Sequence, residues 1–321
     1  MLQLMNIIGI NSFHPDSSAC LIQDGKLMFA IEEERLNRKK HYFGFPVESI
    51  KACLEFANLN INEVDYICIN SNPKINLKKK LIYIIKNFNL KFLFSKLNYK
   101  FKKKSNENIF FSEFKVSNKN IKFLYFDHHL SHLASSFMIS NFDEACCVSV
   151  DGFGDFASTA IGYGKDTKIS IDNRVYFPNS LGIFYQALTQ FLGFVNYGDE
   201  YKLMGLSSYG KPKYIKKISE IIDLDNKNFY YLNLKYFNHQ KSFEGEKTIK
   251  GDMQLFSQNI EEVLGKKRLY SDELTQYHMD LASSVQKKYE DIFFNILEYT
   301  YNKYQNPKLT LSGGCAQNSL A

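Results

Sequence analysis

The sequence lacks several features that would each indicate a particular class of protein. Its 321 residues include no tryptophan, and none of its six cysteines stands in a CxxC pair. Without such a pair, neither a zinc knuckle nor a dithiol redox motif is indicated. No stretch approaches the roughly 20 uncharged apolar residues of a membrane span, and residues 1–10 lack the basic start of a signal peptide. We therefore expect a cytoplasmic protein without a membrane span.

The rest of the composition predicts an α/β protein of two lobes. Hydrophobic residues make up 45% of the chain, and at about 100–200 residues per domain its length indicates two domains. Residues 7–31 and 146–175 each show a strand, a polar turn and a returning strand. The repeat indicates a duplicated architecture, with a first lobe at 1–145 and a second at 146–321.

Hydrophobic periodicity predicts the individual elements. Strands are expected at residues 7–11, 19–22, 27–31, 66–69, 123–126, 145–150, 158–164, 168–175 and 309–311, the last as a buried, central strand. Helices are expected at residues 47–58, 181–191 and 273–304, and a further helix begins after Asp127. Residues 213–270 show no clear pattern.

Positive charge is concentrated in residues 74–122. This segment contains fourteen lysines against Glu107 and Glu113, whereas the whole chain has a net charge of +6. Aromatic residues alternate with the lysines, a composition compatible with binding to RNA or to an anionic membrane surface. A solvated amphipathic helical insertion explains the pattern more simply. We therefore interpret the segment as a basic insertion in the first lobe and do not expect a nucleic-acid partner.

Two histidines and an aspartate form a candidate metal site. His128 and His132 are four residues apart, so they lie on one face of the predicted helix. Two imidazoles so placed can bind one transition-metal ion, and Asp151, at the end of an apolar strand, can supply a third ligand. His129 lies about 100° around the helix and is not expected to bind. The alternative is an ordinary helix N-terminus followed by a turn aspartate.

Glycines at two strand-to-loop turns indicate a nucleotide site. They are Gly152 and Gly154 in the first turn and Gly313 and Gly314 in the second. Residues without a Cβ allow the backbone to approach a phosphate closely, although a single turn of this kind is usually only a tight turn. Two such turns with a polar N-terminal corner suit an actin-like ATPase core. We therefore predict an α/β, actin-like, two-lobed fold.

The chain resembles the NodU/CmcH carbamoyltransferases. The matching segments are IIGINSFHPDSSACLIQDGKLMFAIEEERLNRKKH, DHHLSHLASSF, SVDGFGD, GDEYKLMGLSSYGKP and LSGGCAQN, in the order of the family. The least similar regions are residues 74–120 and 213–270. The resemblance implies an actin-like domain related to the enzymes that place threonylcarbamoyl on tRNA.

The resemblance also implies an activity. In the family, a YrdC-type C-terminal domain makes carbamoyl-adenylate from ATP and carbamoyl phosphate. The actin-like domain then transfers the carbamoyl group to a hydroxyl of a sugar or natural-product acceptor. A divalent metal, usually described as iron, sits in the transfer site. The rival interpretations are an actin-like sugar kinase or ATPase, and an inactive fragment or binding module from a split gene.

The resemblance assigns roles to individual residues. The family's metal ligands fall on His128, His132 and Asp151. His14, in the first loop, has the chemistry of a general base, and Lys39 can stabilise developing negative charge. The alternatives are a role for His14 in the structure of its loop and an ordinary solvated lysine at position 39. The expected contacts to the nucleotide or its phosphates are Gly152, Gly154, Lys202, Gly313, Gly314 and Asn318.

The end of the sequence leads to one more expectation. The chain stops at Ala321, before the family's final aspartate ligand and before any YrdC-type domain. We expect the second lobe to be truncated and a separately encoded YrdC-type domain to be a possible partner. On this interpretation the chain alone neither makes carbamoyl-adenylate nor transfers its carbamoyl group.

Overall fold

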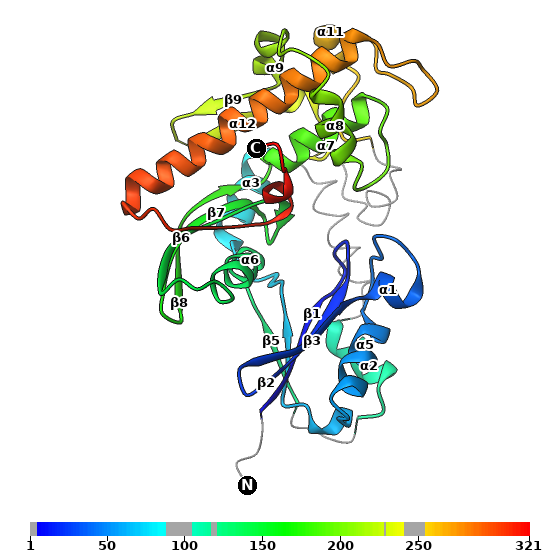
Figure 1. Cartoon of the computed structure of the whole chain (residues 1–321), viewed down its shortest axis with the longest axis vertical. Helices are drawn as coiled ribbons and strands as arrows, with labels where there is room; N and C mark the ends of the chain where they lie inside the picture. Colours follow the sequence, from blue (N-terminus) through cyan, green and yellow to red (C-terminus); the bar gives the residue numbers. More distant parts are fainter. Residues whose placement is uncertain (1–4, 88–104, 117–120, 228, 241–253) are drawn as a thin grey trace. The chain divides into compact units, whose positions relative to one another are not determined.

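The computed structural model describes residues 5–87, 105–116, 121–227, 229–240 and 254–321 (Figure 1). Part of the predicted basic insertion therefore lies outside the described residues. The chain divides into two compact units, which are described separately. Unit 1 comprises residues 1–74 and 93–128, and unit 2 comprises residues 75–92 and 129–321. The lobe boundary at residues 145/146 stays a prediction.

Unit 1 contains a five-stranded mixed sheet with the strand order β3-β2-β1-β4-β5. The strands are β1 (Asn6–Asn11), β2 (Ser18–Gln23), β3 (Lys26–Glu32), β4 (Tyr66–Ile69) and β5 (Lys122–Tyr125). The first three strands form the predicted antiparallel meander, and β4 and β5 continue the sheet in parallel. Burial alternates along β1 because successive side chains point to opposite faces of a sheet.

The described helices of unit 1 are α1 (Glu33–Asn37), α2 (Val47–Phe56), η1 (Ile61–Glu63) and α5 (Asn106–Glu113). Of these, α2 and α5 bury apolar residues against the sheet. Ile50 and Cys53 of α2 and Phe110 of α5 are fully buried against strand residues such as Ile8 and Leu21. These apolar positions of α2 recur at helical spacing, which is why the sequence predicts the helix correctly.

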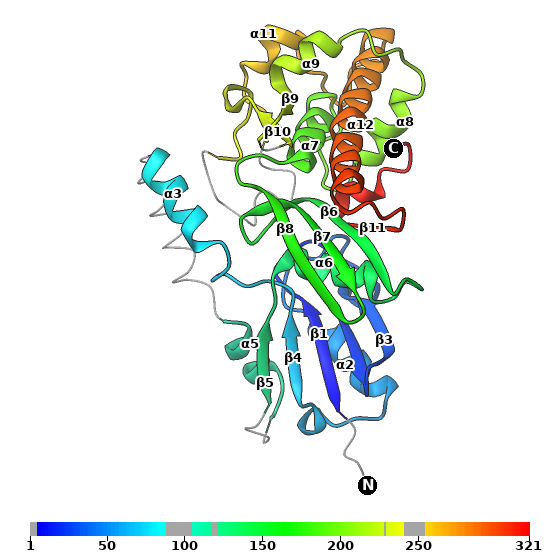
Figure 2. The ribbon, with the colours of Figure 1, turned by 90° about the vertical axis from the view of Figure 1, so that its left-hand side faces the viewer.

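Unit 2 contains a four-stranded sheet with the order β11-β6-β7-β8 (Figure 2). Its strands are β6 (Glu144–Gly154), β7 (Ala157–Lys165), β8 (Lys168–Tyr176) and β11 (Leu309–Ser312). β6 to β8 form the second predicted antiparallel meander, and β11 pairs with β6 in parallel. A meander extended by parallel pairing therefore occurs in both units, and the predicted α/β, actin-like fold is confirmed.

Helices pack on both faces of the unit 2 sheet. Ala145 and Cys147 of β6 face α6 (His128–Phe137), whereas Val148 and Val150 face α7 (Leu181–Phe191) and α12 (Gln276–Tyr304). Coverage of both faces explains why β6 is an almost continuous apolar run. The other elements of unit 2 are α3 (Leu77–Asn87), α8 (Glu200–Ser207), α9 (Ile215–Ile221), β9 (Ile222–Asp225), β10 (Phe229–Leu232), η2 (Leu234–Tyr236), α11 (Ile260–Leu264) and η3 (Gly314–Gln317).

The strand at residues 309–311 is less buried than the sequence predicts. Within the described sheet β11 is an edge strand, and Leu309 and Leu311 are 36% and 38% exposed. Thr310 between them points inward and is buried. By register, Leu309 and Leu311 lie on the same sheet face as Cys146 and Val148, the face on which α12 packs. Their exposure therefore comes from the edge position of β11, which a three-residue apolar run cannot reveal. Among the described residues, no helix is both long and apolar enough to cross a membrane.

The meander of unit 1 provides a matched test of the assigned core. Leu21 is fully buried, whereas Leu27 in the next strand is 62% exposed. Leu21→Ala should lower the free energy of unfolding by about 2–5 kcal/mol, because it removes buried methyl groups and leaves a cavity. Leu27→Ala should change it by less than about 0.5 kcal/mol. Urea unfolding measures both, and equal effects would show that the meander is packed differently.

Candidate functional site

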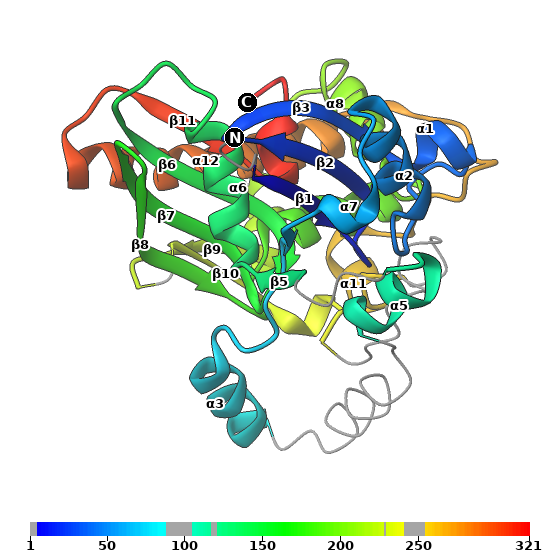
Figure 3. The same ribbon diagram turned by 90° about the horizontal axis from the view of Figure 1, so that it is seen from below.

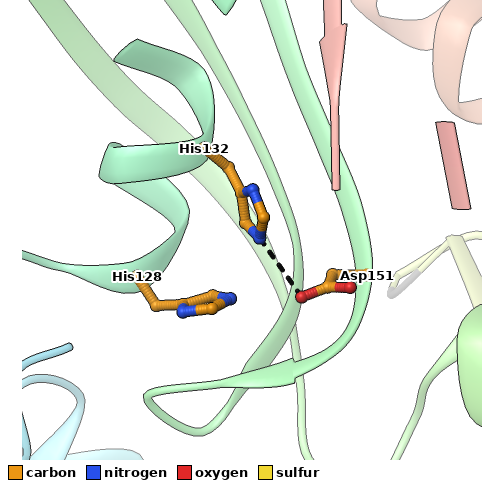
Figure 4. A group of neighbouring side chains, drawn as sticks. All are labelled: His128, His132 and Asp151. Atoms are coloured by element: carbon orange, nitrogen blue, oxygen red, sulfur yellow. Dashed lines mark hydrogen bonds and ion pairs between the residues drawn. The ribbon is translucent and has the colours of Figure 1, made fainter. Parts of the chain in front are cut away.

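The alternation along β6 directs two polar side chains toward α6. Ser149 and Asp151 continue the face that begins with Ala145 and Cys147. The Nε2 atom of His132 lies 3.2 Å from Oδ2 of Asp151 (Figure 4). Both side chains are partly exposed, at 28% and 21%. One helix and the end of one strand thus bring the predicted pair together.

His128 completes the predicted cluster. It is the first residue of α6, one turn before His132, so the continuous helix positions it although the boundary between the units falls directly after it. One ligand atom from each of His128, His132 and Asp151 lies within 4.8 Å of the other two. Ligands about 2.0–2.2 Å from a shared ion are about 3.0–3.6 Å apart, so small side-chain adjustments would let all three bind one ion.

The carboxylate of Asp151 is held from its other side by the diglycine turn. The backbone N–H of Gly314 donates to Oδ1 of Asp151 at 3.1 Å, which leaves Oδ2 directed at His132. Gly313, with φ of +87°, makes this approach possible, because a Cβ there would lie 2.4 Å from the carbonyl oxygen of Val150. The predicted second glycine turn therefore contacts the aspartate of the candidate metal site directly.

The backbone around Asp151 is fixed by a buried hydroxyl. Oγ of Ser180 donates to the carbonyl oxygen of Gly152 at 2.7 Å and accepts from the N–H of Ile183 at 3.1 Å. Ser180 is thus both the N-cap of α7 and a tether for the end of β6. The sequence analysis missed Ser180. A serine directly before the predicted helix at residues 181–191 is a typical N-cap, and this signal could have identified it.

His129 has a different environment from the other two histidines of α6. Its side chain is fully buried, and Nδ1 lies 3.0 Å from Oγ of Ser149. Ser149 precedes Asp151 by two residues on the same face of β6. His129 therefore packs α6 onto the sheet and is not part of the metal-site cluster, in keeping with its predicted position around the helix.

His14 and Lys39 lie on two loops of unit 1 that are bonded to each other. The N–H of Ser17 donates to the carbonyl oxygen of Tyr42 at 3.1 Å, and that of Phe13 donates to the carbonyl oxygen of Gly44 at 3.0 Å. These bonds flank His14 on the first loop and follow Lys39 on the second. The two predicted catalytic residues thus belong to one bonded pair of loops.

The surroundings of the two side chains differ. The ring of His14 is half-buried and stacks on that of His128, with centroids 4.9 Å apart. Lys39 is exposed, and its backbone N–H donates to Oδ1 of Asn37 at 2.8 Å. His14 therefore contacts one of the candidate metal ligands, while Lys39 extends from the surface of its loop.

Asp16, Glu34 and His41 form a second cluster, which the sequence analysis missed. Nδ1 of His41 lies 2.9 Å from Oδ1 of Asp16, and the N–H of His41 donates to Oε2 of Glu34 at 2.8 Å. One ligand atom of each residue lies within 4.8 Å of the others. The three residues have no regular spacing, so periodicity could not identify them. The cluster ties the loop of Lys39 to that of His14.

Two of the remaining predicted nucleotide contacts, Lys202 and Asn318, have protein partners. Nζ of Lys202 forms an ion pair with Asp199 at 2.6 Å, and this hydrogen bond raises the pKa of the lysine. The side-chain amides of Asn318 and Gln286 bond to each other reciprocally at 3.0 Å. Gly152 is sterically open, since a Cβ there would meet no atom within 4 Å. Gly154 pairs with Ala157 across the β6–β7 turn.

An aromatic cluster supports the segment after Asp151. The ring of Phe153 lies 5.1 Å from Phe177 and 5.9 Å from His239. His239 is 6% exposed, and its Nε2–H donates to the carbonyl oxygen of Pro178 at 2.9 Å. Burial disfavours the charged imidazolium and lowers the pKa of His239 to about 4. His239 is therefore neutral in the folded protein near pH 7.

Comparisons with known proteins identify the family to which the chain is similar. The family described as "Carbamoyltransferase N-terminus" matches residues 6–321. An uncharacterised protein of Synechocystis is 32% identical over 329 residues, covering 99% of this chain and 52% of the relative. Nodulation protein NolNO of Sinorhizobium fredii is 29% identical over 312 residues, covering 96% of this chain and 42% of the relative. The chain thus spans about half the length of these curated relatives.

Solved structures also resemble the chain. Component A of (R)-2-hydroxyglutaryl-CoA dehydratase from Acidaminococcus fermentans aligns with a TM-score of 0.43 and 11% identity, covering 98% of this chain and 85% of the other. A Ppx/GppA enzyme of Aquifex aeolicus aligns with a TM-score of 0.30 and 13% identity, covering 99% of each chain.

The two glycine turns should respond differently to an added methyl group. Gly313→Ala should lower the free energy of unfolding by about 1–3 kcal/mol, because its positive φ and the carbonyl of Val150 both oppose a Cβ. Gly152→Ala, with open space around it, should cost less than about 1 kcal/mol. Urea unfolding of both variants measures the difference. Equal stabilities would show that the diglycine turn does not pass the Val150 carbonyl as described.

Acid should destabilise the protein partly through His239. Its folded-state pKa of about 4 lies below the ordinary value of 6.5, so between these values the unfolded chain binds a proton that the folded chain does not. The free energy of unfolding should therefore fall by roughly 1.4 kcal/mol per pH unit as the pH drops from about 6.5 toward 4. His239→Gln retains a donor to Pro178 and should remove this component. Urea unfolding of the wild type and of His239→Gln between about pH 4 and 6.5 tests this prediction. The same dependence of the free energy of unfolding on pH in both proteins would contradict it.

Proposed function

The chain belongs to the carbamoyltransferase N-terminus family, and from this premise we propose that it is the transfer domain of an O-carbamoyltransferase. The reaction moves a carbamoyl group from carbamoyl-adenylate to a hydroxyl of a sugar or natural-product acceptor, in the cytoplasm. The observation that carries the proposal is the cluster of His128, His132 and Asp151 within a chain of this family.

The donor set of the cluster suits a divalent transition metal. Two imidazoles and one carboxylate are a donor set that non-haem Fe(II) sites use. His128, His132 and Asp151 would hold the ion, and the Gly314 N–H would keep the Asp151 carboxylate oriented toward it. When bound, the ion supplies Lewis-acid stabilisation of the negative charge that builds on oxygen during transfer. Iron is therefore the metal that we propose.

The transfer step requires a base for the acceptor. In our proposal, the acceptor oxygen attacks the carbamoyl carbon as His14 takes its proton, and the bond from that carbon to the adenylate phosphate oxygen breaks to release AMP. His14 must be neutral to accept this proton. Its ring stacks on that of His128, one of the proposed ligands. His14 thus supplies the proton acceptor, and the acyl oxygen needs a separate source of positive charge.

Backbone and lysine groups provide the anion contacts in this proposal. Lys39 is exposed on the loop bonded to that of His14, where its charge can meet the adenylate phosphate. Lys202 would act together with Asp199, its ion-pair partner. The glycine turns at Gly152, Gly154, Gly313 and Gly314, with Asn318 after the second, would face the nucleotide through backbone groups.

The source of carbamoyl-adenylate is a further part of the proposal. Because the curated relatives are about twice as long as this chain, their activity can depend on regions that the chain does not match. We propose that a YrdC-type domain makes the adenylate from ATP and carbamoyl phosphate and passes it to this domain. A binding module without transfer activity remains the rival interpretation, and so does an actin-like kinase, which would release ADP instead of AMP.

Two identical substitutions on one helix test the metal site. His132→Asn should abolish binding of Fe(II), because asparagine is too short to replace Nε2 beside Asp151. His129→Asn should leave binding intact, since the asparagine amide can replace Nδ1 beside Ser149. After anaerobic loading with Fe(II), mass spectrometry measures the metal content of both variants. A thermal melt of each variant is the control for folding. Equal metal content in both variants would refute the assignment.

The same pair of variants tests the transfer reaction. The chain is mixed with a YrdC-type domain, ATP, carbamoyl phosphate and a panel of sugar acceptors, and AMP and carbamoylated product are measured. We expect both products with the wild type and with His129→Asn, and a loss of at least about 100-fold with His132→Asn. Metal binding without AMP or product would support a binding module, and ADP with a phosphorylated sugar would support a kinase.

A further inference from the structure

The outward face of α3 is an unusual surface, independent of the metal-site cluster. Leu77, Leu81 and Ile85 recur every fourth residue and are 52%, 57% and 70% exposed. Ile82, beside them, is 48% exposed. At 100° per residue these four side chains share one side of the helix. A short helix thus presents four large aliphatic side chains outward, which we name the α3 aliphatic face.

The opposite side of α3 is anchored to unit 2. The ring of Tyr83 lies 5.0 Å from Phe177 and 5.9 Å from Phe156, and Asn76 Nδ2 donates to the carbonyl oxygen of Asp155 at 2.9 Å. Burial lowers the pKa of Lys80 on this side. These contacts determine which way the helix faces. In Figures 2 and 3 no other labelled element of unit 2 lies against its outer side.

The charged side chains of α3 itself are all lysines. Lys78 and Lys86 are exposed among the aliphatic side chains, and Lys79 lies beside them, over the ring of Tyr176 at 4.9 Å. The sequence has no aspartate or glutamate between residues 66 and 106. Lysines have long aliphatic stems, which can lie along an apolar surface while the ammonium groups remain in a polar layer. The face is therefore complementary to an apolar layer bordered by negative charge.

We propose that the α3 aliphatic face binds the surface of an anionic phospholipid bilayer, with α3 lying in the headgroup region. A helix with aliphatic residues on one side and lysines at its margins is the usual form of an interfacial helix. An RNA partner fits less well, because stacking on bases needs aromatic side chains, and the exposed side chains here are leucine and isoleucine. The anchoring contacts would hold the β6–β7 turn, which follows Asp151, close to the membrane.

Vesicle flotation tests this proposal with the full chain. Vesicles of phosphatidylcholine containing about one third phosphatidylglycerol should bind the protein at least about tenfold more strongly than pure phosphatidylcholine vesicles, and salt should weaken the binding. The double variant Leu81→Asp/Ile85→Asp should lose binding, and Lys78→Gln/Lys86→Gln should reduce it. The matched control is Leu27→Asp/Leu269→Asp, two leucines that are 62% and 55% exposed elsewhere on the chain. This control should bind as the wild type does.

Several results would overturn the proposal. Absence of flotation with anionic vesicles is one, and equal flotation of the Leu81→Asp/Ile85→Asp variant and the control is another. Light scattering that shows a wild-type dimer dissociated by Leu81→Asp/Ile85→Asp would identify a second copy as the occupant. Binding of single-stranded RNA that depends on Lys78 and Lys86, without vesicle binding, would identify nucleic acid. Circular dichroism of each variant confirms that the helix is folded in every comparison.

Discussion

The carboxylate of Asp151 is held near the C-terminal end of β6, where the regular pairing with β7 is interrupted, and the arrangement of the candidate site depends on how it is held. Gly314 donates to one oxygen, and His132 lies beside the other. Each of these partners comes from a different element, and the order of the elements in unit 2 brings them to the same strand end. β11 pairs with β6 in parallel, so the turn after β11 emerges beside the end of β6. A carboxylate with one oxygen committed to a backbone N–H has less freedom to rotate, which favours a defined ligand geometry.

The loops of unit 1 illustrate a different use of charge. Glu33 is 3% exposed, and its carboxylate accepts from the backbone N–H groups of Glu48 and Ser49 and from the Ser49 hydroxyl. These bonds satisfy the free N–H groups at the start of α2, whose own N-cap residue, Pro46, provides no side-chain bond. The hydrogen bonds offset the cost of burying the carboxylate. Glu33 is thus a structural anchor within the charged segment that precedes Lys39. The next residue, Glu34, bonds with His41 and so helps to join the loop of Lys39 to that of His14.

Features that depend on local pattern could be predicted from the sequence. The two meanders, α2, α7 and most of α12 follow from hydrophobic periodicity, because such elements bury one face against a core. The i,i+4 spacing of His128 and His132 and the position of Asp151 at a strand end were sufficient to predict the cluster. The edge position of β11 in the described sheet and the cluster of Asp16, Glu34 and His41 could not be predicted in this way. Which side of a short strand is covered, and which loops meet, depends on contacts between distant parts of the chain.

The sequence by itself determined the fold class, most of the elements and the three residues of the candidate metal site, since each follows from the spacing of residues within one segment. Only the tertiary structure decided that Gly314 orients Asp151, that Ser180 tethers the strand end, that His129 packs against Ser149, and that the aliphatic residues of α3 point outward. These features join segments separated by 20 to 163 residues, or depend on which face of a helix packs against the rest of the chain. The physical reason is that periodicity describes how a segment is partitioned between core and solvent, whereas a specific hydrogen bond requires two segments to meet at a particular register.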